Sequence, residues 1–364
     1  MKVPLTDVQR KIEKYESSIL DAIRRVVSRS NFILGDEVAQ FETEFSQFIG
    51  VKECIGVANG TDALEIALKA LKLPPKSKII AIANAGGYST TAILNCNLIP
   101  KYVDIDYETG NLCLNCLKNV DFENVSGAIL THLYGNPIDK LDEVINLLKA
   151  KGIQIIEDCA QAHGAEYQGK MIGTFGDLSC FSFYPTKNLG CLGDGGAILS
   201  SNRKFSERAR KLRSYGWGVK YEIEESQGRN SRLDELQAAV LRLFLANLAD
   251  ENDQRKIVAD RYRNEITCKN IQFLREIPNS KSSNHLFPVL TSKRLDFINH
   301  LNQRGIQAII HYPILDTQQN ELAVDSHELI NSEEFVRRVV SIPLFPGMLD
   351  EEISYVIQSI NEFV

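Results

Sequence analysis

The chain has 364 residues, 44% of them apolar, and a formal net charge of −6 at pH 7. This composition is typical of a globular protein that is large enough to bury its core without disulfides or structural metals. It excludes a disordered chain. The sequence also lacks the basic tract that nucleic acids or anionic membranes attract, so we expect neither as a partner.

Cysteine usage and hydropathy indicate the compartment. The N-terminal residues contain no apolar run like that of a signal peptide, and no window approaches the roughly 18 apolar residues of a membrane span. The eight cysteines lie mostly in apolar segments, which is typical of reduced thiols in cytoplasmic proteins. Cys113 and Cys116 have no second pair and no nearby histidine, so we expect no metal site.

Short β-rich runs alternate with helical patterns between about residues 50 and 200. Helices are expected at 61–72 and 141–151, where apolar residues recur at helical spacing. This alternation predicts an α/β fold with a mostly parallel sheet. The expected strands are residues 79–83, 101–105, 127–133, 153–157, 178–184 and 196–200.

The sequence suggests a domain boundary after residue 248. A long amphipathic helix is expected at 233–248, and the polar stretch 249–255 follows it. We therefore predict a large domain at 1–248, with an N-terminal helical segment, and a smaller α/β domain at 249–364.

The first chemical motif is a glycine-containing turn at 58–64 that leads into the helix at 61–72. Asp62 and Glu65 are spaced like a capping pair. The free N–H groups and positive dipole end of such a helix suit a phosphate. A plain helix cap remains an alternative interpretation.

Two further motifs place reactive groups beside strands. Asp158 follows the strand at 153–157. Because ligands of open α/β sheets bind beyond the carboxyl ends of the strands, Asp158 could contact a ligand. A carboxylate that only caps the end of the strand fits the sequence equally well. His163, by itself, is more typical of a structural histidine. Lys187 lies between an aromatic strand and a glycine-rich turn, where a poorly solvated amine could form an imine, unless it is an ordinary surface lysine.

These motifs, in this order, resemble the DegT, DnrJ, EryC1 and StrS family of sugar aminotransferases, which are fold-type I pyridoxal phosphate enzymes. The resemblance covers most of the chain and implies an aspartate-aminotransferase-like large domain with a smaller C-terminal domain. The matching segments are residues 35–42, 58–64, 132–137, 156–165, 181–190, 193–198, 230–239 and 310–313.

The resemblance implies roles for the residues near the cofactor ring. Lys187 would hold pyridoxal phosphate as an internal aldimine and then move the proton between substrate and cofactor, with pyridoxamine phosphate as the intermediate form. Asp158 would keep the pyridinium nitrogen protonated, and Gln161 would bond the ring 3-oxygen. Tyr88 would stack on the ring, although residues 84–87 before it depart from the usual family pattern.

The resemblance also implies the phosphate contacts. Gly60, Thr61 and Asp62 would offer the helix N-terminus, and Ser182 its hydroxyl. Asn230 would reach the phosphate of the neighbouring subunit, because family members are homodimers with sites at the interface.

Candidates for substrate contact are weaker. Positive groups are expected near a substrate pyrophosphate, and Lys220 and Arg213 are candidates for this role. The other candidates for substrate contact are Tyr221, His285, His311 and Tyr312.

Family members transfer an amino group, usually from L-glutamate, to a ketone of a nucleotide-linked sugar. Asp194 stands where 4-keto enzymes more often have glutamate, so the resemblance favours C3 amination of a dTDP-linked 3-keto-6-deoxy sugar. A 4-keto sugar, an aminocyclitol ketone and a non-catalytic regulator remain alternatives. Lys187 argues against the related dehydratases, which have histidine there, and the lack of a G-x-G-x-x-G turn argues against a dehydrogenase.

Overall fold

The computed structural model describes residues 1–319 and 329–364. A seven-stranded sheet with the order β1-β9-β8-β5-β4-β2-β3 crosses its centre, and β8, β5, β4, β2 and β3 are parallel. A strand is present at each of the six expected places, although β3 covers 99–102 where 101–105 was expected, and β1 adds an antiparallel edge beside β9. The strands are β1 (Glu53–Val57), β2 (Lys78–Ala81), β3 (Ile99–Tyr102), β4 (Val125–Thr131), β5 (Gln154–Asp158), β8 (Leu178–Ser182) and β9 (Gly196–Ser200).

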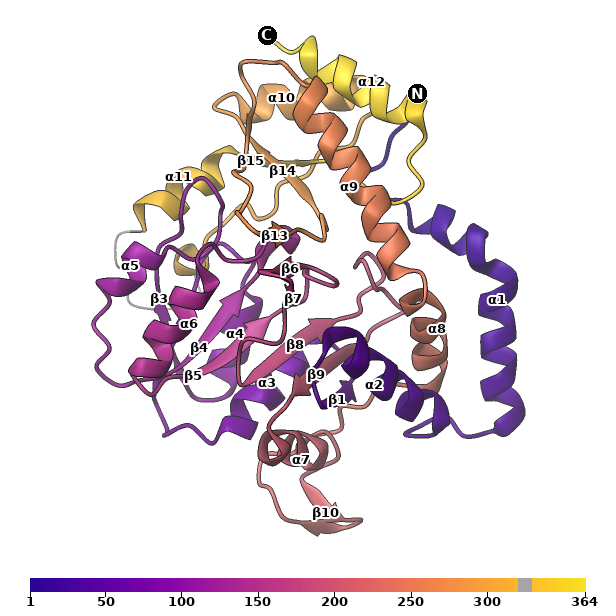
Figure 1. The fold of residues 1–364 in the computed structure, drawn as a ribbon, viewed down its shortest axis with the longest axis vertical. Coiled ribbons are helices and arrows are strands. Elements are labelled where there is room, and N and C mark those ends of the chain that lie inside the picture. The colour runs from indigo at the N-terminus through magenta and orange to yellow at the C-terminus, as the bar shows by residue number, and fades with distance from the viewer. Residues whose placement is uncertain (320–328) are drawn as a thin grey trace.

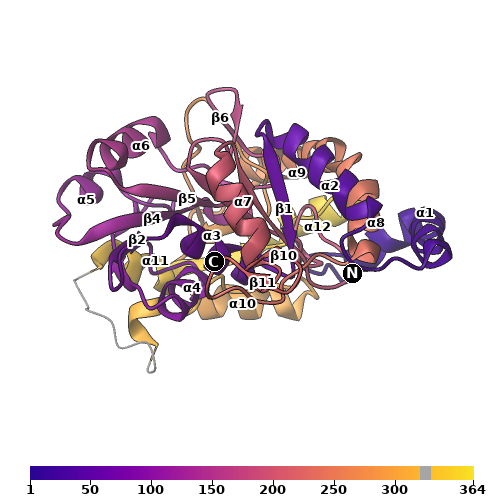
Figure 2. The same cartoon turned by 90° about the horizontal axis from the view of Figure 1, so that it is seen from below.

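Both faces of this sheet are buried under helices. Neighbouring strand residues point to opposite faces, so Ile155 packs in one apolar cluster and Ile156 in the other. One face is covered by α3 (Gly60–Leu71), α4 (Tyr88–Asn95) and α7 (Arg203–Leu212), the other by α2 (Asp36–Ile49), α6 (Leu141–Ala150) and α8 (Glu235–Leu245). Figure 2 shows these layers from below.

A second, smaller core lies in the C-terminal part. It surrounds the antiparallel sheet β12 (Gln272–Phe273), β14 (Phe287–Leu290) and β15 (Val339–Ile342). The first residues of the chain join this core, because Val3 pairs with Ile306 in a parallel bridge. Both ends of the chain therefore lie at the top of Figure 1. The helices of this part are α9 (Leu248–Glu265), α10 (Arg294–Gln303), α11 (Ile330–Arg338) and α12 (Asp350–Asn361).

The remaining elements lie at the edges of the molecule. Helix α1 (Val8–Arg29) runs along one side, and the hairpin of β10 (Trp217–Val219) and β11 (Glu222–Ile223) projects from the lower end in Figure 1. A small sheet links the two parts of the chain because β13 pairs with β6. The other short elements are α5 (Leu114–Lys118), β6 (Glu166–Tyr167), β7 (Lys170–Met171), β13 (Ser280–Lys281), η1 (Leu133–Gly135) and η2 (Asp316–Gln318).

The helices at 61–72 and 141–151 are confirmed as α3 and α6. The long helix expected at 233–248 is wrong in extent, because α8 ends at Leu245 and α9 begins at Leu248. The polar stretch 249–255 is itself helical, within α9. The domain boundary after residue 248 stays a prediction.

No helix among the described residues is long and apolar enough to cross a membrane. The eight cysteines have free thiols. Cys113 caps α5, where its sulfur accepts the N–H of Cys116 at 3.2 Å.

Candidate active site

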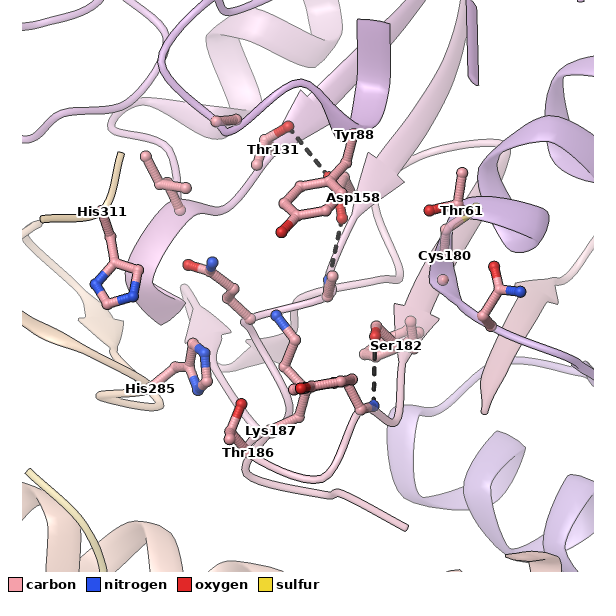
Figure 3. A pocket seen from close by; sticks show the side chains of 18 of the residues that line it. Thr61, Tyr88, Thr131, Asp158, Cys180, Ser182, Thr186, Lys187, His285 and His311 are labelled. Atoms are coloured by element: carbon pink, nitrogen blue, oxygen red, sulfur yellow. Dashed lines mark hydrogen bonds between the residues drawn. The ribbon is translucent and has the colours of Figure 1, made fainter. Parts of the chain in front are cut away.

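A cavity of about 1160 Å³ opens at the carboxyl ends of β5 and β8. Its walls come from the N-terminus of α3, the loops after β5 and β8, and segments of the C-terminal part (Figure 3). The cavity brings together eleven of the predicted site residues. They are Gly60, Thr61, Asp62, Tyr88, Asp158, Gln161, Ser182, Lys187, His285, His311 and Tyr312.

The N-terminus of α3 forms one wall. Its N-cap is Asn59, whose side chain accepts the N–H of Asp62 at 2.8 Å, so the capping pair expected from Asp62 and Glu65 is wrong. The amides of Gly60 and Thr61 belong to the first turn and have no carbonyl a turn earlier to bond. A Cβ on Gly60 would lie 2.7 Å from the Cβ of Ser182, so glycine permits the close approach of the helix to that serine.

Asp158 ends β5 and is almost fully buried. One carboxylate oxygen accepts the N–H of Ala160 at 3.1 Å, and the other accepts a long bond of 3.4 Å from the Thr131 hydroxyl. Burial raises the pKa of Asp158, while the Ala160 N–H and the Lys187 amine oppose the rise. Within residues 1–319 and 329–364, no basic side chain forms an ion pair with this carboxylate, and a buried charge is costly without one.

Lys187 lies on the tight loop that follows β8. Its N–H donates to the carbonyl of Tyr184 at 2.8 Å, and a Cβ on Gly190 would lie 2.5 Å from the Pro185 carbonyl oxygen. Burial lowers the pKa of Lys187 to about 8, and the Asp158 carboxylate opposes this shift. In Figure 3 the amine points into the cavity below Asp158 and Tyr88. An amine with this pKa is about one-tenth unprotonated at pH 7, far more than an ordinary lysine, and the unprotonated form is the one that acts as a nucleophile or base.

Gln161 and two tyrosines line the next part of the cavity. The amide nitrogen of Gln161 donates to the Tyr312 hydroxyl at 3.1 Å. The rings of Tyr88 and Tyr312 meet edge to face at 6.1 Å. Gly86, in the segment that departs from the family pattern, has a φ of +84°, and a Cβ there would lie 3.0 Å from the Tyr312 ring. This glycine therefore allows the turn before α4 to contact Tyr312.

Two histidines from the C-terminal part complete the cavity. The Asn188 amide nitrogen donates to Asn252 and to the Ser283 carbonyl, so its oxygen accepts from Nδ1 of His285. Burial and the neighbouring Lys187 place the pKa of His285 well below its ordinary value.

His311 bonds the Ser341 hydroxyl through Nδ1 at 3.0 Å. Burial, followed by Lys187, lowers its pKa to about 4. Both cavity histidines are therefore neutral near pH 7. His163 is buried against Phe181 and Phe183, which agrees with the structural interpretation.

Three predicted residues lie outside the cavity lining. Lys220 and Tyr221 connect β10 to β11 in the projecting hairpin, where Tyr221 is 74% exposed. Asn230 is exposed and forms a bridge with Ser214. In this structure, none of these three residues lines the cavity of its own chain.

Arg213 was expected near a substrate pyrophosphate, and this prediction is wrong. Its guanidinium is buried and donates to the Glu42 carboxylate and the Gly56 carbonyl. Because Glu42 belongs to α2 and Gly56 to β1, this arginine joins the edge strand to the helix that packs on it.

The sequence did not indicate several residues of the cavity. Thr6 and Gln307 contribute to its lining because the N-terminal strand-like segment pairs with residues near Ile306. Arg229 also lines it and pairs with both Asp62 and Glu65. In the sequence, the feature that could have pointed to Arg229 is its position next to Asn230.

His132, Glu157 and Cys159 form a buried group with ligand atoms within 4.8 Å of one another. The Glu157 carboxylate already accepts the N–H groups of Gly173, Phe175 and Gly176, and it bonds His132 at 3.2 Å. These bonds explain the cluster as an anchor for the loop at 173–176, without a metal.

The fold and the cavity define the class of this protein: an α/β enzyme with a lysine amine at the carboxyl edge of a mostly parallel sheet. Residues 13–361 match the DegT/DnrJ/EryC1/StrS aminotransferase family. The chain therefore belongs to this family, whose members depend on pyridoxal phosphate, and it is an aminotransferase.

Two relatives and one solved structure are similar over nearly the whole chain. One is dTDP-3-amino-3,6-dideoxy-α-D-galactopyranose transaminase of Aneurinibacillus thermoaerophilus, 38% identical over 99% of both chains. Another is dTDP-3-amino-3,4,6-trideoxy-α-D-glucose transaminase of Streptomyces venezuelae, 35% identical over 100% of this chain and 96% of its own. The crystal structure of S. venezuelae DesV with a ketimine intermediate is 34% identical, has a TM-score of 0.96, and covers 99% of this chain and 98% of its own.

Proposed function

We propose that this chain holds pyridoxal phosphate at Lys187 and moves an amino group from L-glutamate to the C3 ketone of a dTDP-linked 6-deoxy sugar. The observation that carries the proposal is the Lys187 amine of lowered pKa, close enough to the Asp158 carboxylate for each to shift the other's pKa. A lysine and a carboxylate at the carboxyl edge of the sheet are the two groups that this chemistry requires.

The residues present fit the cofactor. The α3 N-terminus and the Ser182 hydroxyl, brought together by Gly60, offer donors suited to a phosphate dianion. The buried Asp158 carboxylate would gain a cationic partner from a protonated ring nitrogen. The Gln161 amide is available near Tyr312 for the ring oxygen, and the exposed ring of Tyr88 for stacking.

Pyridoxal phosphate supplies an aldehyde for amines and an electron-withdrawing ring. Lys187 would hold the aldehyde covalently and, once displaced by a substrate amine, act as the base that moves the proton from the substrate carbon. Asp158 would keep the ring nitrogen protonated throughout. The neutral His285 and His311 can accept or donate hydrogen bonds to sugar hydroxyls without adding charge to the cavity.

Two observations favour the sugar. Both curated relatives described above are named for 3-amino deoxy sugars linked to dTDP. The turn of this chain has Asp194 in the cavity lining, at the position where the family resemblance distinguishes 3-keto from 4-keto enzymes. A 4-keto sugar or an aminocyclitol ketone is the alternative substrate. The presence of Lys187, Asp158 and Gln161 together argues against a non-catalytic regulator.

We further propose a homodimer in the cytoplasm. The exposed Asn230 and the hairpin residues Lys220 and Tyr221 do not line the cavity described above, and a second copy of the chain would offer them its cavity. Free thiols at all eight cysteines suit a reducing compartment.

A substrate panel tests the proposal. Purified protein is incubated with pyridoxal phosphate, L-glutamate and 3-keto or 4-keto sugar nucleotides, and the products are identified by mass spectrometry and NMR. We expect a 3-amino dTDP sugar and 2-oxoglutarate. Amination of the 4-keto compounds alone would overturn the C3 assignment, and no spectral change of the cofactor with glutamate would overturn the donor.

A further inference from the structure

The first turns of α3 carry a concentrated negative charge. Asp62 and Glu65 lie close together at the helix N-terminus, and their side chains are only 11% and 6% exposed. One guanidinium nitrogen, Nη1 of Arg229, lies 3.1 Å from the Asp62 carboxylate and 2.6 Å from the Glu65 carboxylate. All three residues line the cavity.

The other partner of this cluster is neutral. The amide nitrogen of Asn95 donates to Glu65 at 2.7 Å. Among the ion pairs formed by residues 1–319 and 329–364, Arg229 supplies the one cation that pairs with Asp62 or Glu65. Arg229 is thus the residue that compensates the negative charge of Asp62 and Glu65 at the N-terminus of α3.

The backbone holds Arg229 in this position. Its N–H donates to the Leu212 carbonyl at 2.8 Å, and its carbonyl accepts the N–H of Tyr215 at 3.0 Å. The next residue, Asn230, pairs with Ser214 in an antiparallel bridge. Successive side chains in extended chain point to opposite sides. Arg229 therefore faces the cavity of its own chain while Asn230 is exposed.

A phosphate dianion at this helix end would meet the two carboxylates. Like charges within a few ångströms in a poorly solvated site disfavour binding unless an opposite charge compensates them. We propose that Arg229 is a positioning residue that neutralises Asp62 and Glu65 and so makes the N-terminus of α3 receptive to the cofactor phosphate. The inference rests on the proposed function, because it requires pyridoxal phosphate in this cavity.

The test compares two ligands that differ only in the phosphate. Cofactor-free protein is titrated with pyridoxal phosphate and with pyridoxal, and both dissociation constants are measured by absorbance and equilibrium dialysis. We expect Arg229→Gln to raise the constant for pyridoxal phosphate at least about tenfold, or ~1.4 kcal/mol, and to leave that for pyridoxal unchanged. Arg229→Lys keeps the charge and should stay within about threefold of the unchanged protein.

A second variant separates neutralisation from direct contact. The double variant combines Arg229→Gln with Glu65→Gln. It removes one of the two carboxylates that Arg229→Gln leaves without a cation, and the new amide at position 65 can still accept the hydrogen bond from Asn95. We expect the double variant to recover much of the affinity for pyridoxal phosphate. Failure to recover would mean that the guanidinium contacts the phosphate itself, which overturns neutralisation.

Two further outcomes would count against the inference. Equal weakening of pyridoxal and pyridoxal phosphate in Arg229→Gln would mean a purely structural role, and no weakening of either would mean no role. A melting temperature close to that of the unchanged protein checks that the variants fold. If the unchanged protein binds neither ligand, the proposed function fails first, and this result is distinct from the others.

Discussion

The floor of the cavity, formed by Asp158 and Lys187, differs from the β10–β11 hairpin in the contacts that hold its polar residues in place. Asp158 ends a central strand and Lys187 lies on a loop closed by its own backbone bonds, so one chain fixes both. Lys220 and Tyr221, at the tip of the hairpin, are exposed, and Figure 1 shows that β10 lies at the lower end of the molecule. One subunit is therefore enough to position the floor, whereas in the proposed dimer the hairpin and Asn230 would act on the cavity of a second subunit. The predictions below test this difference.

The largest effect is expected from Lys187→Ala. Loss of the covalent anchor and of the acid and base should lower kcat by about 10⁴-fold or more. The phosphate and ring contacts remain, so pyridoxamine phosphate should still bind, as measured by equilibrium dialysis. Full activity in this variant would rule out Lys187 as the reacting amine.

Asn230→Asp should be nearly inactive, with kcat lowered on the order of 10³-fold, because a carboxylate would face the phosphate of the partner's site. Mixing it with Lys187→Ala gives hybrids in which one site inherits both defects and the other inherits none. Equal mixing should form half hybrids and restore about a quarter of the original activity.

Mass spectrometry shows whether subunits exchange in this mixture. If they do exchange and no activity returns, Asn230 serves the cavity of its own chain.

Asp158→Asn should keep the cofactor but lower kcat about a hundredfold, because a neutral amide cannot hold the ring nitrogen protonated. A decrease below about tenfold, ~1.4 kcal/mol of barrier, would mean that Asp158 is not the partner of the ring. The matched control is Thr131→Val, which removes only the 3.4 Å bond to the same carboxylate. We expect it to keep kcat within about tenfold of the original value.

The pKa of Lys187 gives a prediction for the cofactor-free protein. Because this pKa is lowered to about 8, the amine is protonated and unreactive at lower pH, and its labelling by acetic anhydride should rise through pH 8 and level off above it. Lys14, whose pKa is raised by its bond to Tyr15, should label only at higher pH.

Asp158→Asn sharpens this test. The Asp158 carboxylate raises the pKa of Lys187 against the effect of burial. Its removal should therefore shift the labelling curve of Lys187 to lower pH. Peptide mass spectrometry after labelling at several pH values measures both curves, and a shift to higher pH would contradict the electrostatic interaction between Lys187 and Asp158.

The smallest effects are expected in the hairpin. Lys220→Ala and Tyr221→Phe should raise KM for the sugar nucleotide by about threefold to tenfold and leave kcat within about twofold, since neither residue lines the cavity of its own chain. Cofactor affinity should not change. A loss of kcat as large as that of Asp158→Asn would place the hairpin in the chemical step.

Local patterns were enough to predict much of the fold. The strands were found because apolar β-rich runs are short and bounded by turns, and α3 and α6 because their apolar residues recur at helical spacing. The same patterns placed Asp158 at the end of a strand and Lys187 after another. The local patterns gave wrong predictions where contacts with other residues determine how a helix begins. Asn59 caps α3 where the sequence suggested Asp62, and the polar start of α9 is helical.

By itself, then, the sequence determined the approximate places of the strands, the lysine loop and the glycine turn, because each depends on residues close together in the chain. Tertiary structure decided which distant segments complete the cavity: Leu5 is bonded to Gln307, and Arg229 is paired with Asp62 of α3. It also decided that Arg213 is buried on Glu42 rather than open to a substrate. These contacts join residues more than 150 positions apart, and no local periodicity encodes such a pairing. Only the order of strands in the sheet and the packing of the C-terminal part bring them together.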